Sequence, residues 1–240
     1  MVTKNQIKFI KGLSLKKNRI KYKKFVVEGE KIIKEFINSN YKVEKIYSLS
    51  PEKFSGYKSD LISVKELKSL SNLKSPNGDL AVFNVTSYRL KNENFYIVLD
   101  GINDPGNLGT IIRTCEWFGI NQIICSKNSV DCYNSKVIQA SMGSLSRVHV
   151  FYDDILSFID SKKMDVYGAD INGERYDDVK IKNSGIWVFG SESHGISKNI
   201  ISKIDKKVKI PKSNDSIKTE SLNLPVSLGI ILSKLDFNKN

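Results

Sequence analysis

The chain has 240 residues, of which 40% are hydrophobic and 27% are charged, and its formal net charge is +12. This length allows a sizeable core in one large or two modest domains. No apolar run approaches the roughly 20 residues that span a bilayer, and no uninterrupted signal-peptide core follows the basic N-terminus. We therefore expect a soluble, cytoplasmic protein with no membrane partner.

A disulfide framework and a metal site both lack support in the sequence. Cys115, Cys125 and Cys132 are odd in number and have no CxxC spacing. His149 and His194 are the only histidines, and neither has further ligand-type side chains at zinc-site spacing. We expect ordinary reduced thiols and no metal.

The positive charge is concentrated near the N-terminus. Residues 1–95 hold 20 Lys and Arg against 9 Asp and Glu, whereas residues 96–240 hold 18 against 17. Residues 1–24 contain nine basic residues and no acidic one, interleaved with Phe9 and Tyr22. This pattern is typical of a surface that lies along phosphates, although a solubilising lysine-rich arm is an alternative. The candidate phosphate-binding residues are Lys16, Lys17, Arg19, Lys21, Lys23 and Lys24.

The first part of the chain is predicted to form a small α/β unit. Hydrophobic periodicity predicts, in chain order, a helix at Asn5–Leu13, a strand at Phe25–Val27, a helix at Lys31–Asn38, a strand at Lys45–Leu49, a helix at Val64–Leu70 and a strand at Leu80–Val85. The polar segment Ser87–Asn94 is the predicted linker.

The second part begins with a strand at Phe95–Leu99 and a helix for which Asn107 is the predicted N-cap. Further predicted strands lie at Gln122–Cys125, His149–Phe151, Asp165–Ala169, Gly185–Phe189 and Lys207–Ile210, and helices at Ser135–Met142, Ile155–Ser161 and Leu222–Leu235. Alternating strands and helices indicate a mostly parallel sheet covered on both faces. Ligands bind such sheets beyond the carboxyl ends of the strands.

The helix that starts near Asn107 has two distinct faces. The first is apolar and is expected to pack on the sheet; it consists of Leu108, Ile111, Ile112, Cys115 and Phe118. The second holds Thr110, Arg113 and Trp117, and a guanidinium beside a large aromatic ring suits a cleft or a subunit contact. A solvated Arg113 paired with Glu116 is the alternative.

Three loops at strand ends are unusual. They are Asn103–Asn107, the segment GSESHG at Gly190–Gly195, and the segment from Ile210 to Asn223. Glycines flanking Glu192 would let the backbone approach a ligand closely, although such a segment is also common as a surface turn. The glycines near the first loop do not give the GxGxxG pattern of a dinucleotide-binding site.

Four motifs, in this order, resemble those of the SpoU/TrmH family of RNA ribose 2′-O-methyltransferases. They are DPGNLGTIIRT with Asn107 and Arg113, SVDCYNSKVIQASMGS at Ser129–Ser144, VFGSESHGIS at Val188–Ser197, and Ile210-Pro211 followed by ESLNLPVSLGI at Glu220–Ile230. The segment FVVEGEKIIKEF at Phe25–Phe36 also resembles the substrate-binding domain of many members, whose fold is similar to that of ribosomal protein L30e.

The resemblance implies an α/β SPOUT fold, with a mostly parallel sheet and a C-terminal deep trefoil knot, after a small L30e-like α/β domain. The implied domains are a basic RNA substrate-binding domain at residues 1–92 and a methyltransferase domain at residues 95–240. Members bind S-adenosylmethionine in the knot loops and work as homodimers, with the active site at the subunit boundary. The implied partners are therefore RNA and a second copy of the chain.

The resemblance also implies roles for individual residues. Gly190, Ile210 and Leu222 match cofactor-contacting positions, and Asn107, Arg113, Glu192, Ser221 and Asn223 match catalytic-site positions. Two features depart from the family pattern: the longer loop KSNDSIKTE after Pro211, and Pro225 in the first turn of the last helix.

The implied reaction is methyl transfer from S-adenosylmethionine to a ribose 2′-hydroxyl. Because a guanidinium is protonated at neutral pH, we expect Arg113 to hold an adjacent phosphate and stabilise the developing alkoxide rather than to act as a base. The N-terminal domain favours 23S rRNA as substrate. A tRNA 2′-O-methyltransferase and a catalytically silent RNA-binding member remain alternatives.

Overall fold

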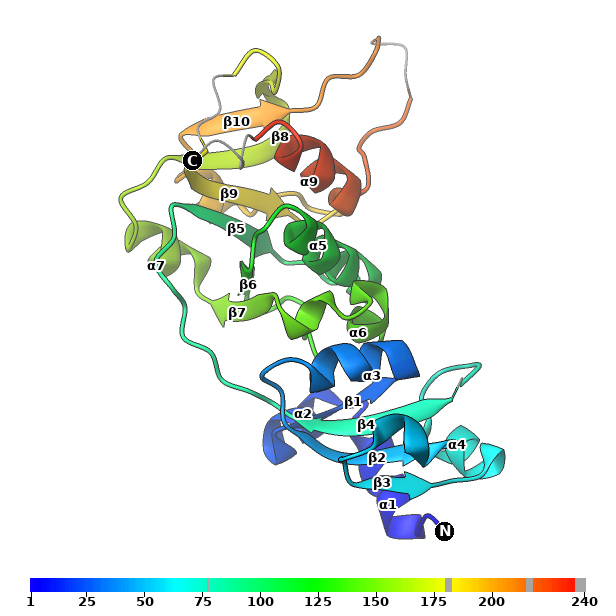
Figure 1. The fold of residues 1–240 in the computed structure, drawn as a ribbon. Coiled ribbons are helices and arrows are strands. Elements are labelled where there is room, and N and C mark those ends of the chain that lie inside the picture. Colours follow the sequence, from blue (N-terminus) through cyan, green and yellow to red (C-terminus); the bar gives the residue numbers. More distant parts are fainter. Residues whose placement is uncertain (77, 180–182, 215–217, 236–240) are drawn as a thin grey trace. The chain divides into compact units, whose positions relative to one another are not determined.

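The computed structural model describes all of the chain except residues 77, 180–182, 215–217 and 236–240 (Figure 1). The chain forms two compact units. The first contains Met1–Tyr88 and Asp131–Arg147, and the second contains Arg89–Val130 and the chain from Val148 onward. The segment Asp131–Arg147 thus packs with residues that lie far from it in sequence.

The first unit is built on a sheet with the strand order β1-β4-β2-β3. Its strands are β1 (Lys24–Glu28), β2 (Val43–Ser48), β3 (Ser59–Leu61) and β4 (Asp79–Asn84). Both β1 and β2 run antiparallel to β4, and β3 runs parallel to β2. Its helices are α1 (Lys4–Gly12), α2 (Lys16–Tyr22), α3 (Glu30–Ile37), α4 (Val64–Leu70), α6 (Ser135–Ser141) and the 3₁₀ turns η1 (Pro51–Phe54) and η2 (Ser144–Ser146).

Two apolar clusters hold this unit together. Buried side chains of α1 and α4 pack with alternate residues of the sheet, and they include Ile10, Leu13, Val26, Leu67, Leu70, Leu80 and Val82. A second cluster is aromatic and contains Phe25, Phe36, Tyr41, Phe83 and Tyr133. Because Tyr133 belongs to the segment Asp131–Arg147, this segment completes the aromatic core.

The second unit contains a six-stranded, fully parallel sheet of order β10-β8-β9-β5-β6-β7. The strands are β5 (Phe95–Asp100), β6 (Gln122–Ser126), β7 (His149–Asp153), β8 (Val166–Arg175), β9 (Gly185–Gly190) and β10 (Lys206–Lys209). The helices are α5 (Pro105–Trp117), α7 (Ile155–Asp160), α8 (Lys198–Ile201) and α9 (Leu224–Leu232). The predicted mostly parallel α/β fold is confirmed.

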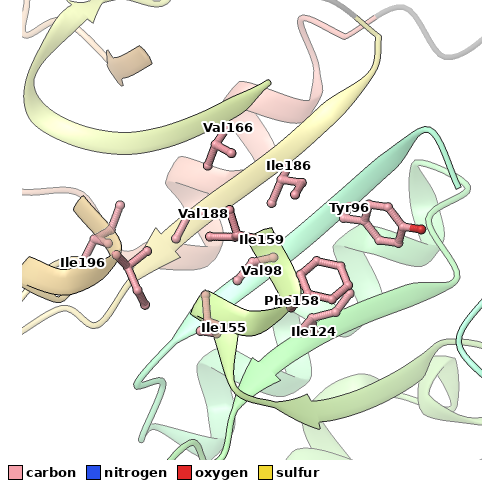
Figure 2. Packing of buried hydrophobic residues seen from close by; sticks show 11 residues of the cluster. Tyr96, Val98, Ile124, Ile155, Phe158, Ile159, Val166, Ile186, Val188 and Ile196 are labelled. Atoms are coloured by element: carbon pink, nitrogen blue, oxygen red, sulfur yellow. The ribbon is translucent and has the colours of Figure 1, made fainter. Parts of the chain in front are cut away.

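Helices cover both faces of this sheet. Figure 2 shows Val98, Ile186 and Val188 of the central strands packed near Phe158 and Ile159 of α7. Residues that alternate with these along the strands point to the other face. Figure 1 shows α5 and α9 side by side within this unit, where they pack against each other. Of the predicted apolar face of α5, Leu108, Ile111, Ile112 and Cys115 are fully buried.

Several boundaries differ from the prediction for identifiable reasons. The helix at Val64–Leu70 has the predicted bounds, and a capping box of Ser63 and Glu66 fixes its start. In contrast, α2, β3 and α8 were not predicted. The elements β3 and α8 have only three and four residues, and α2 has only two apolar or aromatic side chains, too few for a periodic pattern. The last helix begins at Leu224, after Asn223, and accommodates Pro225 in its first turn, where an unpaired amide is normal.

Candidate active site

The candidate site lies at the carboxyl ends of two neighbouring strands of the second unit. β5 and β9 are paired in parallel, with Asp100 opposite Gly190 at their ends. The chain continues from Asp100 into the loop before α5, and from Gly190 into the loop GSESHG. Two of the three predicted loops therefore start from the same edge of the sheet.

The start of α5 differs from the prediction in a way that matters for the site. Asp104, not Asn107, is the N-cap, and its Oδ1 accepts a hydrogen bond of 2.7 Å from the backbone N–H of Asn107. Pro105 occupies the first helical position, which lacks a partner for an amide in any case. Because Asp104 performs the capping, the side chain of Asn107 is available for other contacts.

Glu192 is the centre of a hydrogen-bond network that joins the loop GSESHG to the first turn of α5 and to the start of α9. Its Oε1 accepts from Asn107 Nδ2 at 2.8 Å, from Asn223 Nδ2 at 2.9 Å and from the backbone N–H of Leu224 at 3.4 Å. Asn223 Nδ2 also donates to Asn107 Oδ1 at 3.1 Å. The carboxylate lies at the N-terminus of α9, where negative charge is favoured. The structure thus brings together three of the five predicted catalytic residues.

The loop that carries Glu192 is folded back tightly on itself. Ser191 and Gly195 form an isolated antiparallel bridge with backbone hydrogen bonds of 3.1 and 2.8 Å. A Cβ on Gly190 would lie 2.0 Å from the carbonyl carbon of Gly195, so only glycine fits there. At the end of the loop, the N–H of Ser197 donates to the buried Asp100 carboxylate at 2.8 Å. These contacts fix the position of Glu192.

Arg113 lies on the exposed face of α5, as predicted from its spacing. Thr110 and Trp117 are also exposed, and the Trp117 side chain is 86% accessible. Within the part of the chain that is described, the Arg113 guanidinium forms no hydrogen bond or ion pair, and the alternative pairing with Glu116 is therefore not present. An arginine with this freedom can bind an added anion without breaking an existing contact.

Three further predicted site residues belong to the third predicted loop, which runs from Ile210 to Asn223. Ser221 and Leu222 are exposed immediately before α9, and Ile210 is half-buried just after β10. Residues 215–217 of the longer loop between Ile210 and Leu222 lie outside the described residues. The structure does not bring Arg113 or Ser221 into hydrogen-bond contact with the Glu192 network, as far as the described residues extend.

Two residues that support the site were not predicted from the sequence. Asp100 anchors the end of the GSESHG loop, and Asp104 caps α5. The signal for Asp104 was present, since Asp followed by Pro is a common helix start. No comparable signal existed for Asp100, because its partner Ser197 is 97 positions away.

Arg19 differs from the other basic candidates and is a correction to the prediction. Its side chain is buried, and Asp131 Oδ2 accepts from its Nε at 2.7 Å and lies 2.6 Å from its Nη2. Its Nη1 also donates to the carbonyls of Leu13 and Ser14. Through these contacts the Arg19 guanidinium stabilises the fold of the first unit instead of facing a ligand. We therefore remove Arg19 from the candidate RNA-binding residues.

The lysines among the candidate phosphate-binding residues have a different environment from that of Arg19. Lys24 is half-buried and paired with Glu44. The lysine side chains that remain exposed along α2 and its C-terminal end are those of Lys16, Lys17, Lys21 and Lys23. These four lysines form the exposed basic surface of α2.

The cysteines show no sign of a reactive site. Cys115, Cys125 and Cys132 are all buried, and burial raises the pKa of the Cys115 and Cys125 thiols. Among the described residues, no group of three or more His, Cys, Asp and Glu side chains is placed to hold a metal ion. None of the described helices combines the length and apolar character needed to cross a membrane.

Comparison with known protein families shows to which family the chain belongs. The family model described as the SpoU rRNA Methylase family matches residues 94–233. The chain belongs to this family. A second model, the MRM3-like substrate binding domain, matches residues 4–81. The resemblance inferred from the motifs is confirmed.

Similar proteins span nearly the whole chain. The 23S rRNA (guanosine(2553)-2′-O)-methyltransferase RlmP of Bacillus subtilis is 27% identical, covering 97% of this chain and 96% of that protein. A solved TrmH-family structure from Porphyromonas gingivalis is 31% identical, has a TM-score of 0.87 and covers 97% of both chains. The AdoMet-bound rRNA methyltransferase structure from Sinorhizobium meliloti has a TM-score of 0.85 at 23% identity, covering 97% of this chain and 94% of that one, and shares the fold.

Proposed function

We propose that this SpoU-family protein transfers a methyl group from S-adenosylmethionine to a ribose 2′-hydroxyl of 23S rRNA. The observation that carries the proposal is the network in which Glu192 joins Asn107 and Asn223 at the carboxyl edge of the parallel sheet. Residues 1–92 are the proposed RNA-binding domain and residues 95–240 the proposed methyltransferase domain. The similarity to RlmP supports rRNA as substrate.

The loops beside the network fit the proposed cofactor. Gly190 leaves no room for a side chain, and the half-buried Ile210 and exposed Leu222 lie at the ends of the third loop. We propose that these three residues hold S-adenosylmethionine, with the loops threaded as the knot that the family resemblance implies. When bound, the cofactor supplies an electrophilic methyl group, and backbone amides at such loops suit its polar atoms.

The chain's own residues would act mainly by positioning and by charge. Methyl transfer requires in-line attack by the ribose hydroxyl, so much of the acceleration comes from orientation. Arg113 has no competing partner among the described residues and would hold the neighbouring phosphate while stabilising the developing alkoxide. Glu192, held by Asn107 and Asn223, would fix the loop beside the cofactor. Ser221 would line the same site.

A methylation map of cellular RNA tests the proposed function. Deletion of the gene in the source organism is expected to remove one ribose 2′-O-methyl mark from 23S rRNA, and expression of the wild-type chain should restore it. Loss of a tRNA mark instead would support the tRNA alternative. An unchanged map in both RNA classes would indicate a catalytically silent RNA-binding member.

The exposed face of α5 supports a homodimer. Trp117 is 86% exposed although it is a large apolar side chain, and Val226 of the neighbouring helix α9 is also exposed. Because α9 is apolar on nearly all sides, its outer face is better suited to a protein contact than to water. We propose that a second copy covers this face and completes the active site around Arg113.

Replacement of Trp117 tests this dimer. The wild-type chain is expected to sediment as a dimer at micromolar concentration, and Trp117→Glu should weaken dimerisation by at least tenfold because it places a charge in an apolar contact. Ile171→Glu is a matched control, since Ile171 is 66% exposed on β8 of the same unit. A wild-type monomer, or an equal effect of both substitutions, would contradict the proposed interface.

A further inference from the structure

Helix α2 buries one charged side chain and leaves two large apolar or aromatic side chains exposed. The residue it buries is Arg19, which is 4% exposed. The outward side chains include Ile20, which is 66% exposed, and Tyr22, which is 42% exposed. A helix that packs on a protein core normally buries its apolar residues and exposes its charged ones. This arrangement leaves apolar surface available to a partner.

The ion pair of Arg19 fixes this orientation. Arg19 donates to Asp131 and to the carbonyls of Leu13 and Ser14, so α2 cannot rotate to bury its apolar residues without breaking a buried ion pair. Successive helical residues are about 100° apart, so Ile20 and Tyr22 lie on opposite flanks of α2, with the exposed Lys21 between them. Both side chains are accessible to solvent, each on its own flank of the helix.

The surroundings of these two residues favour a polyanion as the partner. Lys16, Lys17, Lys21 and Lys23 are exposed along α2 and its C-terminal end. The Lys21 Nζ lies 5.3 Å from the centre of the Tyr22 ring, and the rings of Phe9 and Tyr22 form a T-shaped pair at a centroid distance of 5.2 Å. An acidic protein surface would match the charge, but it would not offer flat apolar faces beside each phosphate as an unpaired nucleotide does.

We propose that Tyr22 stacks on an unpaired nucleobase of the RNA while the exposed lysines of α2 contact the flanking phosphates. This inference rests on the proposed function, since it assumes that RNA is the partner, and it adds the kind of RNA that is bound. Bases in a duplex are already stacked and cannot be reached by the ring. The first unit therefore selects single-stranded or bulged RNA.

Binding measurements on the full-length chain separate stacking from charge. A fluorescently labelled single-stranded RNA and its duplex would be titrated over a range of salt concentrations. Tyr22→Ala is expected to weaken single-strand binding about tenfold at every salt concentration without changing the salt slope. Tyr22→Phe keeps the ring and should retain wild-type affinity. Lys21→Ala should instead reduce the slope by about one.

Tyr57→Ala is the matched control. Tyr57 is 43% exposed in the same unit but lies outside α2, and its replacement should leave RNA affinity unchanged. If the wild-type chain binds RNA and Tyr22→Ala binds it equally well, the stacking inference is wrong and the proposed function is unaffected. If Tyr22→Ala weakens binding of the single strand and of the duplex equally, the stacking inference is also wrong. A wild-type chain that binds neither RNA would overturn the proposed function itself.

Discussion

Replacing Arg113 with alanine is expected to lower methyl-transfer turnover by about 10²-fold or more, as loss of one preorganised electrostatic contact does in other enzymes. Arg113 is exposed on α5 and has no partner within the described residues of its own chain, so its removal should leave the fold of the chain intact. Single-turnover methylation of RNA measures the effect directly. Arg175→Ala, which removes another exposed arginine of the same unit, should retain the wild-type rate.

Arg113→Lys distinguishes charge from geometry. Lysine keeps the positive charge but lacks the planar fork of donors that binds a phosphate through two hydrogen bonds. Substantial rescue by lysine would indicate that charge alone stabilises the alkoxide, whereas a comparable loss in both variants would indicate bidentate binding. An Arg113→Ala chain that methylates RNA at the wild-type rate would show that Arg113 has no part in the reaction.

Asp131→Ala is expected to destabilise the first unit by about 3–5 kcal/mol, because it leaves the buried Arg19 guanidinium without its counter-charge. The side chains of Arg19 and Asp131 are 5% and 13% exposed, so water screens the pair only weakly. Hydrogen exchange of the β1 and β4 amides is the suitable measurement, since the chain has two units and global unfolding need not be two-state.

Two further variants show whether the effect comes from the buried charge. The double variant Arg19→Met with Asp131→Leu should lower the stability of the first unit less than Asp131→Ala alone, because no unpaired buried charge remains. Lys34→Ala breaks the exposed pair with Glu30 in the same unit and should change amide exchange little. If Asp131→Ala increases amide exchange in the first unit no more than Lys34→Ala does, the ion pair does not hold the segment Asp131–Arg147 in place.

The buried Arg19 shows that a basic residue in this N-terminal region can stabilise the fold instead of facing solvent or a ligand. Net charge identifies a basic region, but it does not distinguish a side chain that faces solvent from one that anchors the fold. Arg19 belongs to the second kind. The same ion pair that removes one candidate from the RNA-binding set therefore leaves the neighbouring lysines and Tyr22 exposed to solvent.

The sequence by itself determined the class of the fold and the two faces of α5. Periodicity depends only on which side chains are apolar, and it correctly separated the buried Leu108 and Ile112 from the exposed Arg113 and Trp117. The motifs also predicted Asn107, Glu192 and Asn223 as site residues, and the structure brings their side chains together.

Only the tertiary structure decided which side chains meet. Asn107 and Glu192 are 85 positions apart, and Arg19 and Asp131 are 112 positions apart, so no local pattern could pair them. Local signals also assigned the cap of α5 to Asn107, whereas Asp104 performs it and leaves Asn107 to the network. The physical reason is that hydrogen bonds and ion pairs depend on distance in space, while periodicity and charge counts record only the order of residues along the chain.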